Sequence, residues 1–304
     1  MSIGVCYDSS IRNNGTGILV FDALQRSLGF GDTVRRYEPH GLLPPQDLYL
    51  YVDDGRDDNK WECPKPNAYW AIDTHLGYDY RAWKAKQFDR VYCAQKDGAE
   101  KMRQDGLPAE WLPLACHPPC HPNQAELMQH PAREELCSRG LHKMYDVAFI
   151  GFLNKGWGEN SNNRVEFLDH LFKEFTNFWI TTNCFFEEMA VRYVRSRVGM
   201  NISILNDLNM RFFELLSIGV CQVTNRDQIG WQELGFEEGK HFLGFDGKSE
   251  MCEKVQWALD HPEEREQIAQ AGHELARKKH TYAHRVQRIL DDAGIKLPER
   301  VNGG

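Results

Sequence analysis

The chain has 304 residues, enough for two domains of ordinary size with separate hydrophobic cores. Its formal net charge of −8 at pH 7 argues against a general nucleic-acid-binding protein, because such proteins need a basic surface. Nine unevenly spaced cysteines indicate reduced thiols, and without a membrane-length apolar run or a signal-peptide-like start we expect a cytoplasmic protein.

The first apolar run, Ile3–Tyr7, predicts a strand that leads through a polar loop into a helix around Leu19. A strand, a glycine-containing loop and a helix typically open a nucleotide-binding fold, because the N–H groups at the helix start can bind an anion. Asn14, Gly15 and Gly17 in this loop are therefore candidate ligand contacts. The alternative is that the two glycines only shape the turn, and the pattern is not that of a dinucleotide site.

Further strands are predicted at residues 33–37, 47–52, 68–72, 90–93 and 111–114, with helical segments between several of them. This alternation predicts a parallel sheet covered by helices on both faces. Ligands of such sheets bind at the carboxyl ends of the strands. The acidic run 53–58 follows one such end and is more typical of a solvated loop than of a metal site.

Asp73 and His75 follow the predicted strand 68–72 and flank a single residue, so both side chains can face the same space. A carboxylate beside an imidazole raises the pKa of the imidazole and orients it as a general base, which makes the two residues candidate catalytic groups. The alternative is that this turn caps a helix over residues 76–87.

A proline-rich stretch, Leu112–Pro122, contains four potential zinc ligands: Cys116, His117, Cys120 and His121. Its prolines make the chain stiff and extended, and adjacent Cys-His pairs rarely converge on one ion. We therefore expect no metal site here, and we interpret residues 116–143 as a linker.

A second strand, loop and helix unit begins at Tyr145, where an apolar strand ends in Gly151 and a helix is predicted over residues 163–175. Lys155 and Arg164 stand where a cation can neutralise an anion bound by the loop, although both can equally be ordinary surface cations. The following elements are predicted at residues 177–181, 185–196, 198–203, 228–234, 241–245, 248–259, 262–280 and 281–293.

The run from Asn209 to Thr224 holds a single carboxylate within an apolar helix and strand. Asn209 can cap the helix, and Gly219 can end it. Glu214 needs a partner because burying an unpaired charge is costly, and Arg211 lies one turn before it on the same face. A core ion pair between the two is therefore one interpretation.

The second interpretation comes from a resemblance. Glu214 followed by Gly219 and an apolar strand resembles the C-terminal half of the Glu-x7-Glu signature of GT-B glycosyltransferases, and the segment Met210–Glu214 is similar to their spore-maturation-protein branch. The likeness continues through segments 231–235, 241–246, 260–265 and 280–285, and it is strong over roughly the last half of the chain. Asn206 departs from the pattern, because the superfamily has its first glutamate there.

This resemblance implies two Rossmann-like α/β domains and transfer of a sugar from a nucleotide-sugar donor, without a metal ion or another cofactor. By the resemblance, Glu214 binds the ribose hydroxyls, Lys155, Arg164 and Arg211 lie near the diphosphate, and Gly151 and Asn209 shape the same site. The acceptor is not identified: a glycan, a protein, a small molecule and a modified nucleic-acid base all stay open.

The predicted domains are residues 1–115 for the acceptor and 144–280 for the donor. Residues 281–304 form a helix, which can pack back on the first domain, and a loose tail. Two other functions are consistent with the sequence: a binding protein with a degenerate GT-B fold, and a nucleotide-sugar epimerase of the same architecture.

Overall fold

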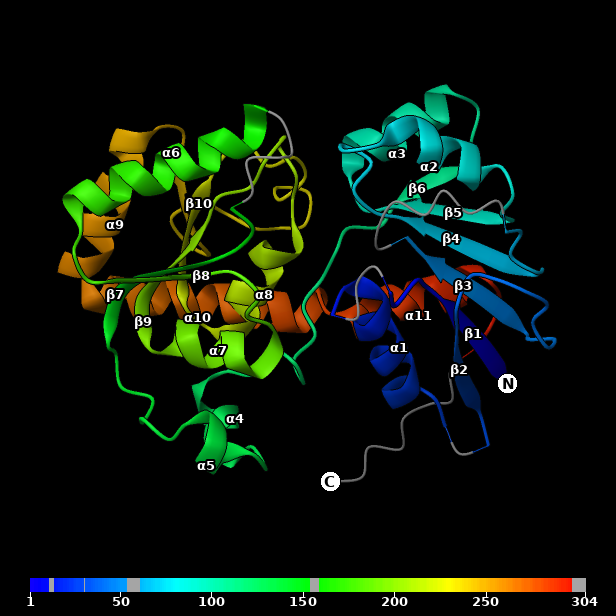
Figure 1. The fold of residues 1–304 in the computed structure, drawn as a ribbon, viewed down its shortest axis with the longest axis horizontal. Helices are drawn as coiled ribbons and strands as arrows, with labels where there is room; N and C mark the ends of the chain where they lie inside the picture. The colour runs from blue at the N-terminus through cyan, green and yellow to red at the C-terminus, as the bar shows by residue number, and fades with distance from the viewer. Residues whose placement is uncertain (11–13, 30, 54–60, 154–158, 297–304) are drawn as a thin grey trace. The chain divides into compact units, whose positions relative to one another are not determined.

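The computed structural model describes residues 1–10, 14–29, 31–53, 61–153 and 159–296. The chain divides into two compact units: unit 1 comprises Met1–Leu114 with Tyr282–Gly304, and unit 2 comprises Ala115–Thr281 (Figure 1). Among the described helices, none is both long enough and apolar enough to cross a membrane.

Unit 1 is built on a six-stranded parallel sheet in the order β2-β1-β3-β4-β5-β6, which confirms the predicted parallel sheet. Its strands are β1 (Ser2–Cys6), β2 (Thr33–Tyr37), β3 (Leu48–Val52), β4 (Asn67–Ala71), β5 (Arg90–Cys93) and β6 (Ala109–Trp111). Its helices are α1 (Thr16–Ser27), α2 (Tyr78–Ala85), α3 (Lys96–Gln104) and α11 (Tyr282–Asp292).

Helices cover both faces of this sheet. Successive residues of a strand point to opposite faces, so neighbouring side chains contact different helices. In β4, Tyr69 packs in a core cluster with residues of α2 and α3, whereas the neighbouring Trp70 meets Tyr282 of α11 edge to face at 6.0 Å. The helix α11 also packs against α1, and its Arg285 donates to the carbonyl oxygen of Pro113 at 2.8 Å. The last helix of the chain is thus part of unit 1.

Unit 2 contains a five-stranded parallel sheet in the order β11-β10-β9-β7-β8. Its strands are β7 (Tyr145–Ile150), β8 (Phe178–Thr181), β9 (Ser196–Asn201), β10 (Cys221–Asn225) and β11 (Leu243–Phe245). Its helices are α4 (Gln124–Gln129), α5 (Arg133–Leu136), α6 (Glu159–Glu174), α7 (Phe186–Val194), α8 (Met210–Ile218), α9 (Lys248–Asp260) and α10 (Pro262–Lys279).

Two core clusters hold the helices of unit 2 on opposite faces of its sheet. One joins α6 and α9 to the sheet around Phe149 and Met200, and the other joins α7 and α8 to it around Ala148 and Ile150. The chain order reverses between β7 and β9, which lie side by side although β8 comes between them in sequence. The carboxyl ends of β7 and β9 therefore form the topological switch point where sheets of this kind bind ligands.

Two segments differ from the expected elements, and the segment interpreted as a linker belongs to unit 2. This last segment, residues 116–143, carries α4 and α5, and Asn123 and Glu126 form a capping box at the start of α4. Residues 228–234 form turns without the predicted helix. The strand expected at residues 111–114 lies at Ala109–Trp111, because Pro113 cannot donate to the sheet.

Candidate functional site

Arg164 connects the loops that follow β7 and β9, at the switch point of unit 2. Its Nη1 donates to the carbonyl oxygen of Phe152, just after β7, at 2.8 Å, and its Nε donates to that of Ile202, just after β9, at 2.9 Å. Burial, aided by the nearby Arg211 guanidinium, lowers the pKa of Arg164 to about 10. Two cations close together repel each other, so an anion bound between these loops would relieve the repulsion.

Glu214 lies on the buried face of α8 and contacts two side chains. Its Oε2 lies 2.8 Å from Nη1 of Arg211, as the spacing predicts, and its Oε1 lies 3.1 Å from Nε2 of His121. Burial alone would raise the pKa of Glu214, but Arg211 and His121 outweigh it and lower the pKa to about 2. The residue is only 3% exposed, so its carboxylate is part of a core charge cluster.

His121 brings the proline-rich segment onto α8. Its ring Nδ1 accepts the backbone N–H of His117 at 3.0 Å, while its carbonyl oxygen accepts the Ser217 hydroxyl and a guanidinium N–H of Arg277. Cys116 packs elsewhere, with its thiol 3.3 Å from the carbonyl oxygen of His280. Cys116 and His121, two of the four potential zinc ligands, therefore have different partners, and His121 contacts Glu214.

The start of α8 and the loop before it are tied to β9. Asn209 caps the helix as predicted, accepting the N–H of Phe212 at 3.0 Å, and its amide pairs with that of Asn201 at the end of β9 at 3.2 Å. Leu205 and Asn206 have φ values of +52° and +58°, which are uncommon for residues other than glycine. Such outliers cluster at functional sites, and these two lie at the carboxyl edge of the sheet.

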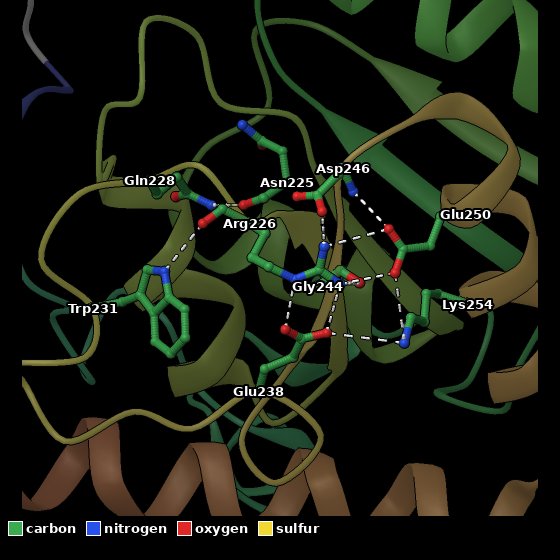
Figure 2. A network of polar contacts seen from close by, with 9 residues as sticks. All are labelled: Asn225, Arg226, Gln228, Trp231, Glu238, Gly244, Asp246, Glu250 and Lys254. Atoms are coloured by element: carbon green, nitrogen blue, oxygen red, sulfur yellow. Dashed lines mark hydrogen bonds and ion pairs between the residues drawn. The ribbon is translucent and has the colours of Figure 1, made fainter.

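The loop after β10 is held by a charged network around Arg226 (Figure 2). Its guanidinium lies 2.7 Å from Glu238 and 2.8 Å from Glu250, and it also contacts Asp246. Hydrogen bonds from Arg226 lower the pKa of both glutamates. Arg226 thus joins the end of β10 to the loop after β11, and no local sequence pattern indicates this role.

Gly151 follows β7 directly, and its N–H donates to the carbonyl oxygen of Thr181 at 3.2 Å. A Cβ atom here would come within 2.8 Å of the Phe149 ring, so the close packing requires glycine. Lys155, predicted to bind the anion from the same loop, lies outside the described residues.

The predicted glycine loop of unit 1 packs against its own strand. Gly17 stands in the first turn of α1, where a Cβ atom would lie 2.4 Å from the Tyr7 ring. Gly15 occupies the N-cap position of α1, and Asn14 precedes it in a turn. The packing accounts for glycine at position 17, and a ligand role for Asn14, Gly15 and Gly17 stays a prediction.

Asp73 and His75 come together after β4, with a carboxylate oxygen and a ring nitrogen within 4.8 Å of each other. Asp73 has a φ of +58°, and among the described residues the buried Nδ1 of His75 has no hydrogen-bond partner. Between them, Thr74 is buried, and both its N–H and its hydroxyl donate to Oε1 of Gln95 at 3.1 Å. Gln95 thus holds the middle of the turn inward, and the turn does not cap α2, which begins at Tyr78.

Replacing Gln95 by leucine should release this turn. The Thr74 N–H would lose its acceptor in a buried site, which costs about 1–3 kcal/mol. The Thr74 hydroxyl would keep only the sulfur atom of Cys93, 3.5 Å away. The Thr74 amide should then exchange its hydrogen with solvent roughly tenfold faster or more, as NMR can measure. Gln87→Leu, in the same unit, is the matched control and should leave this rate unchanged. Equal rates in Gln95→Leu and the wild type would show that Gln95 does not hold the turn.

A model of the glycosyl transferase-like family matches residues 133–291, just over half of the chain. No curated protein matches. Three solved structures resemble the whole chain at low identity. One is sucrose-phosphate synthase from Thermosynechococcus elongatus, with 9% identity, a TM-score of 0.62, and coverage of 96% of this chain and 98% of that one.

The second is an α-glucosyltransferase in complex with UDP and a 13-mer DNA containing an HMU base, with 10% identity and a TM-score of 0.63. The third is Alr3699/HepE from Anabaena in complex with UDP and glucose, with 11% identity and a TM-score of 0.63. Each alignment covers 97% of this chain and 99% of the other. The two parallel α/β units thus have the predicted GT-B fold, and the chain belongs to the glycosyl transferase-like family.

Proposed function

We propose that this protein transfers a sugar, such as a hexose, from a nucleotide-sugar donor to an acceptor, and that unit 2 binds the donor. Arg164 carries this proposal, because it places a cation across the carboxyl ends of β7 and β9 with carbonyl groups as its hydrogen-bond partners. Guanidinium groups bind phosphate oxygens with strong, directional hydrogen bonds. The sequence of α8 favours the spore-maturation-protein branch of the family.

In this proposal the donor diphosphate binds beside Arg164, with Arg211 adding positive charge from α8. As the bond from the anomeric carbon to the diphosphate oxygen breaks, negative charge develops on the leaving diphosphate, and fixed cations stabilise it. We infer that these arginines provide this stabilisation without a metal ion.

Glu214 contributes in this account by holding Arg211, with which it forms an ion pair at 2.8 Å. For Glu214 to bind ribose, one of its carboxylate oxygens would have to leave His121 and accept a hydrogen bond from a ribose hydroxyl instead. Arg211 and His121 both stabilise the Glu214 carboxylate, Arg211 more strongly.

Unit 1 would bind the acceptor. Asp73 and His75 stand at the carboxyl edge of its sheet, where His75 can accept the proton of an attacking hydroxyl or, in a retaining enzyme, position the acceptor. Because one structural relative was solved with DNA containing an HMU base, such DNA belongs in a panel of acceptors together with sugars, glycans and proteins.

Nucleoside diphosphates provide the test, because they require no knowledge of the acceptor. A ligand present at one hundred times its Kd stabilises the native state by about 2.7 kcal/mol, which raises the melting temperature. We expect at least one of UDP, GDP and ADP to do so, and the matching nucleotide-sugar to yield a glycosylated product detectable by mass spectrometry. A melting temperature that none of the three changes would contradict the proposal.

A further inference from the structure

Four large apolar side chains are exposed at one edge of unit 2. Phe152 is 57% exposed, Phe185 38%, Leu205 39% and Ile229 36%. They lie in the loops that follow β7, β8, β9 and β10, respectively. Since the strands are parallel, all four loops lie at the carboxyl edge that also carries Arg164 (Figure 1). This edge therefore combines positive charge with apolar surface.

The loop between β8 and α7 holds Phe185 in an unusual backbone segment. Asn183 and Phe186 have φ values of +51° and +52°, and a bulky residue such as phenylalanine rarely adopts this conformation. Cys184, between them, is buried in the cluster beneath α7. The loop is thus anchored through Cys184, and it leaves the Phe185 side chain partly exposed, with its ring centroid 6.5 Å from that of Phe186.

Phe185 is connected to Arg211 through the first turn of α7. The N–H of Met189 donates to the carbonyl oxygen of Phe185 at 3.2 Å, and the sulfur atom of Met189 contacts the Arg211 guanidinium. Four residues of α-helix rise by about 6 Å, so the Phe185 backbone lies about one turn from the residue that touches Arg211. A nucleotide with its diphosphate at Arg164 and Arg211 would bring its base to this neighbourhood.

We propose that Phe185 is the stacking platform for the nucleobase of the donor, an assignment that rests on the function proposed above. Every nucleobase has a π face, so it can stack on an aromatic ring without specific hydrogen bonds. Phe185 offers such a ring with a fixed backbone, and it loses little conformational freedom when a base covers it. Leu205 and Ile229 lack a π face. Phe152 has one, but it stands at the proposed diphosphate site itself, where its backbone carbonyl oxygen accepts a hydrogen bond from Arg164.

The test compares a nucleotide with its diphosphate part alone. Calorimetry on the full chain would give Kd values for inorganic pyrophosphate and for whichever of UDP, GDP and ADP binds the wild type most tightly. Phe185→Ala should weaken nucleotide binding about tenfold to a hundredfold, the usual effect of removing one stacking ring, and leave pyrophosphate binding unchanged. Phe185→Tyr, which keeps the ring, should bind the nucleotide as the wild type does.

Phe172 provides the matched control, because it is a similarly exposed phenylalanine of unit 2 on α6, stacked on Phe178. Phe172→Ala should leave both Kd values unchanged. Unchanged nucleotide affinity in Phe185→Ala, or equal losses for nucleotide and pyrophosphate, would overturn the stacking role while the wild type still binds nucleotide. A wild type that binds none of the three nucleotides would overturn the proposed function and this assignment together.

Discussion

Replacing Glu214 by alanine is expected to lower the free energy of unfolding by about 3–5 kcal/mol. The substitution removes the carboxylate that lies 2.8 Å from Arg211 and 3.1 Å from His121, and it leaves the Arg211 cation in the protein interior without its partner. Chemical denaturation of the wild type and the variant measures the difference. Glu188→Ala is the matched control, since Glu188 pairs with Arg192 on an exposed face of α7 and should contribute at most about 1 kcal/mol.

The contribution of Glu214 should also depend on pH in a defined direction. Its pKa is lowered from 4.5 to about 2 in the folded protein, so the unfolded chain binds its proton first as the pH falls. The stabilisation is therefore complete above about pH 4.5 and is lost as the pH falls toward 2. Glu214→Gln lacks this titration, and the stability difference between the wild type and Glu214→Gln should shrink over that interval.

Nucleotide affinity measured on the same variants distinguishes the two interpretations of Glu214. If the carboxylate binds ribose hydroxyls, Glu214→Ala should weaken nucleoside diphosphate binding by about one to two orders of magnitude, because a hydrogen bond to a charged group contributes roughly 1.5–3 kcal/mol. A melting temperature equal to that of the wild type, combined with such a loss, would contradict the core charge cluster and favour the ribose contact.

Arg164→Met is expected to weaken donor binding strongly. The variant lacks the cation and both of its hydrogen bonds to the loops after β7 and β9. Losing one charge-assisted contact with the diphosphate should weaken nucleoside diphosphate binding about tenfold to a hundredfold. Arg164→Lys should recover part of the affinity, because lysine keeps the charge but lacks the planar fork that spans two carbonyl groups.

The control for this substitution is Arg197→Met. Arg197 stands near the start of β9, where it pairs with Asp146 of β7 at 2.8 Å, and so it lies at the opposite edge of the same sheet. Its replacement should leave nucleotide affinity unchanged. If both methionine variants lost affinity equally, general destabilisation of unit 2 would explain the result, and the role assigned to Arg164 would fail.

Local sequence signals predicted much of unit 2. Asn209 caps α8 with its side chain, and Gly219, which has no side chain, ends the helix in the left-handed conformation. Few residue types suit either position, so both roles could be predicted. The pair of Arg211 and Glu214 was predictable from helical spacing. These predictions succeed since each depends on residues within two turns of one another.

Contacts between distant segments could not be predicted in the same way. His121 lies far from Glu214 in sequence, and nothing in the proline-rich segment indicates that its ring reaches α8. Arg164 was a candidate, but its carbonyl partners at Phe152 and Ile202 depend on the strand order, which periodicity does not reveal. The buried Gln95 that holds Thr74 is likewise a tertiary contact between two loops. The proximity of the Asp73 and His75 side chains could be predicted, because only one residue separates them.

The most direct test of the donor site is a crystal structure of the full chain with a bound nucleoside diphosphate. We expect the diphosphate to lie beside Arg164, between the loops that follow β7 and β9, with its oxygens within hydrogen-bond distance of the guanidinium. A well-ordered nucleotide at the carboxyl edge of unit 1, near Asp73 and His75, with no density beside Arg164, would contradict it.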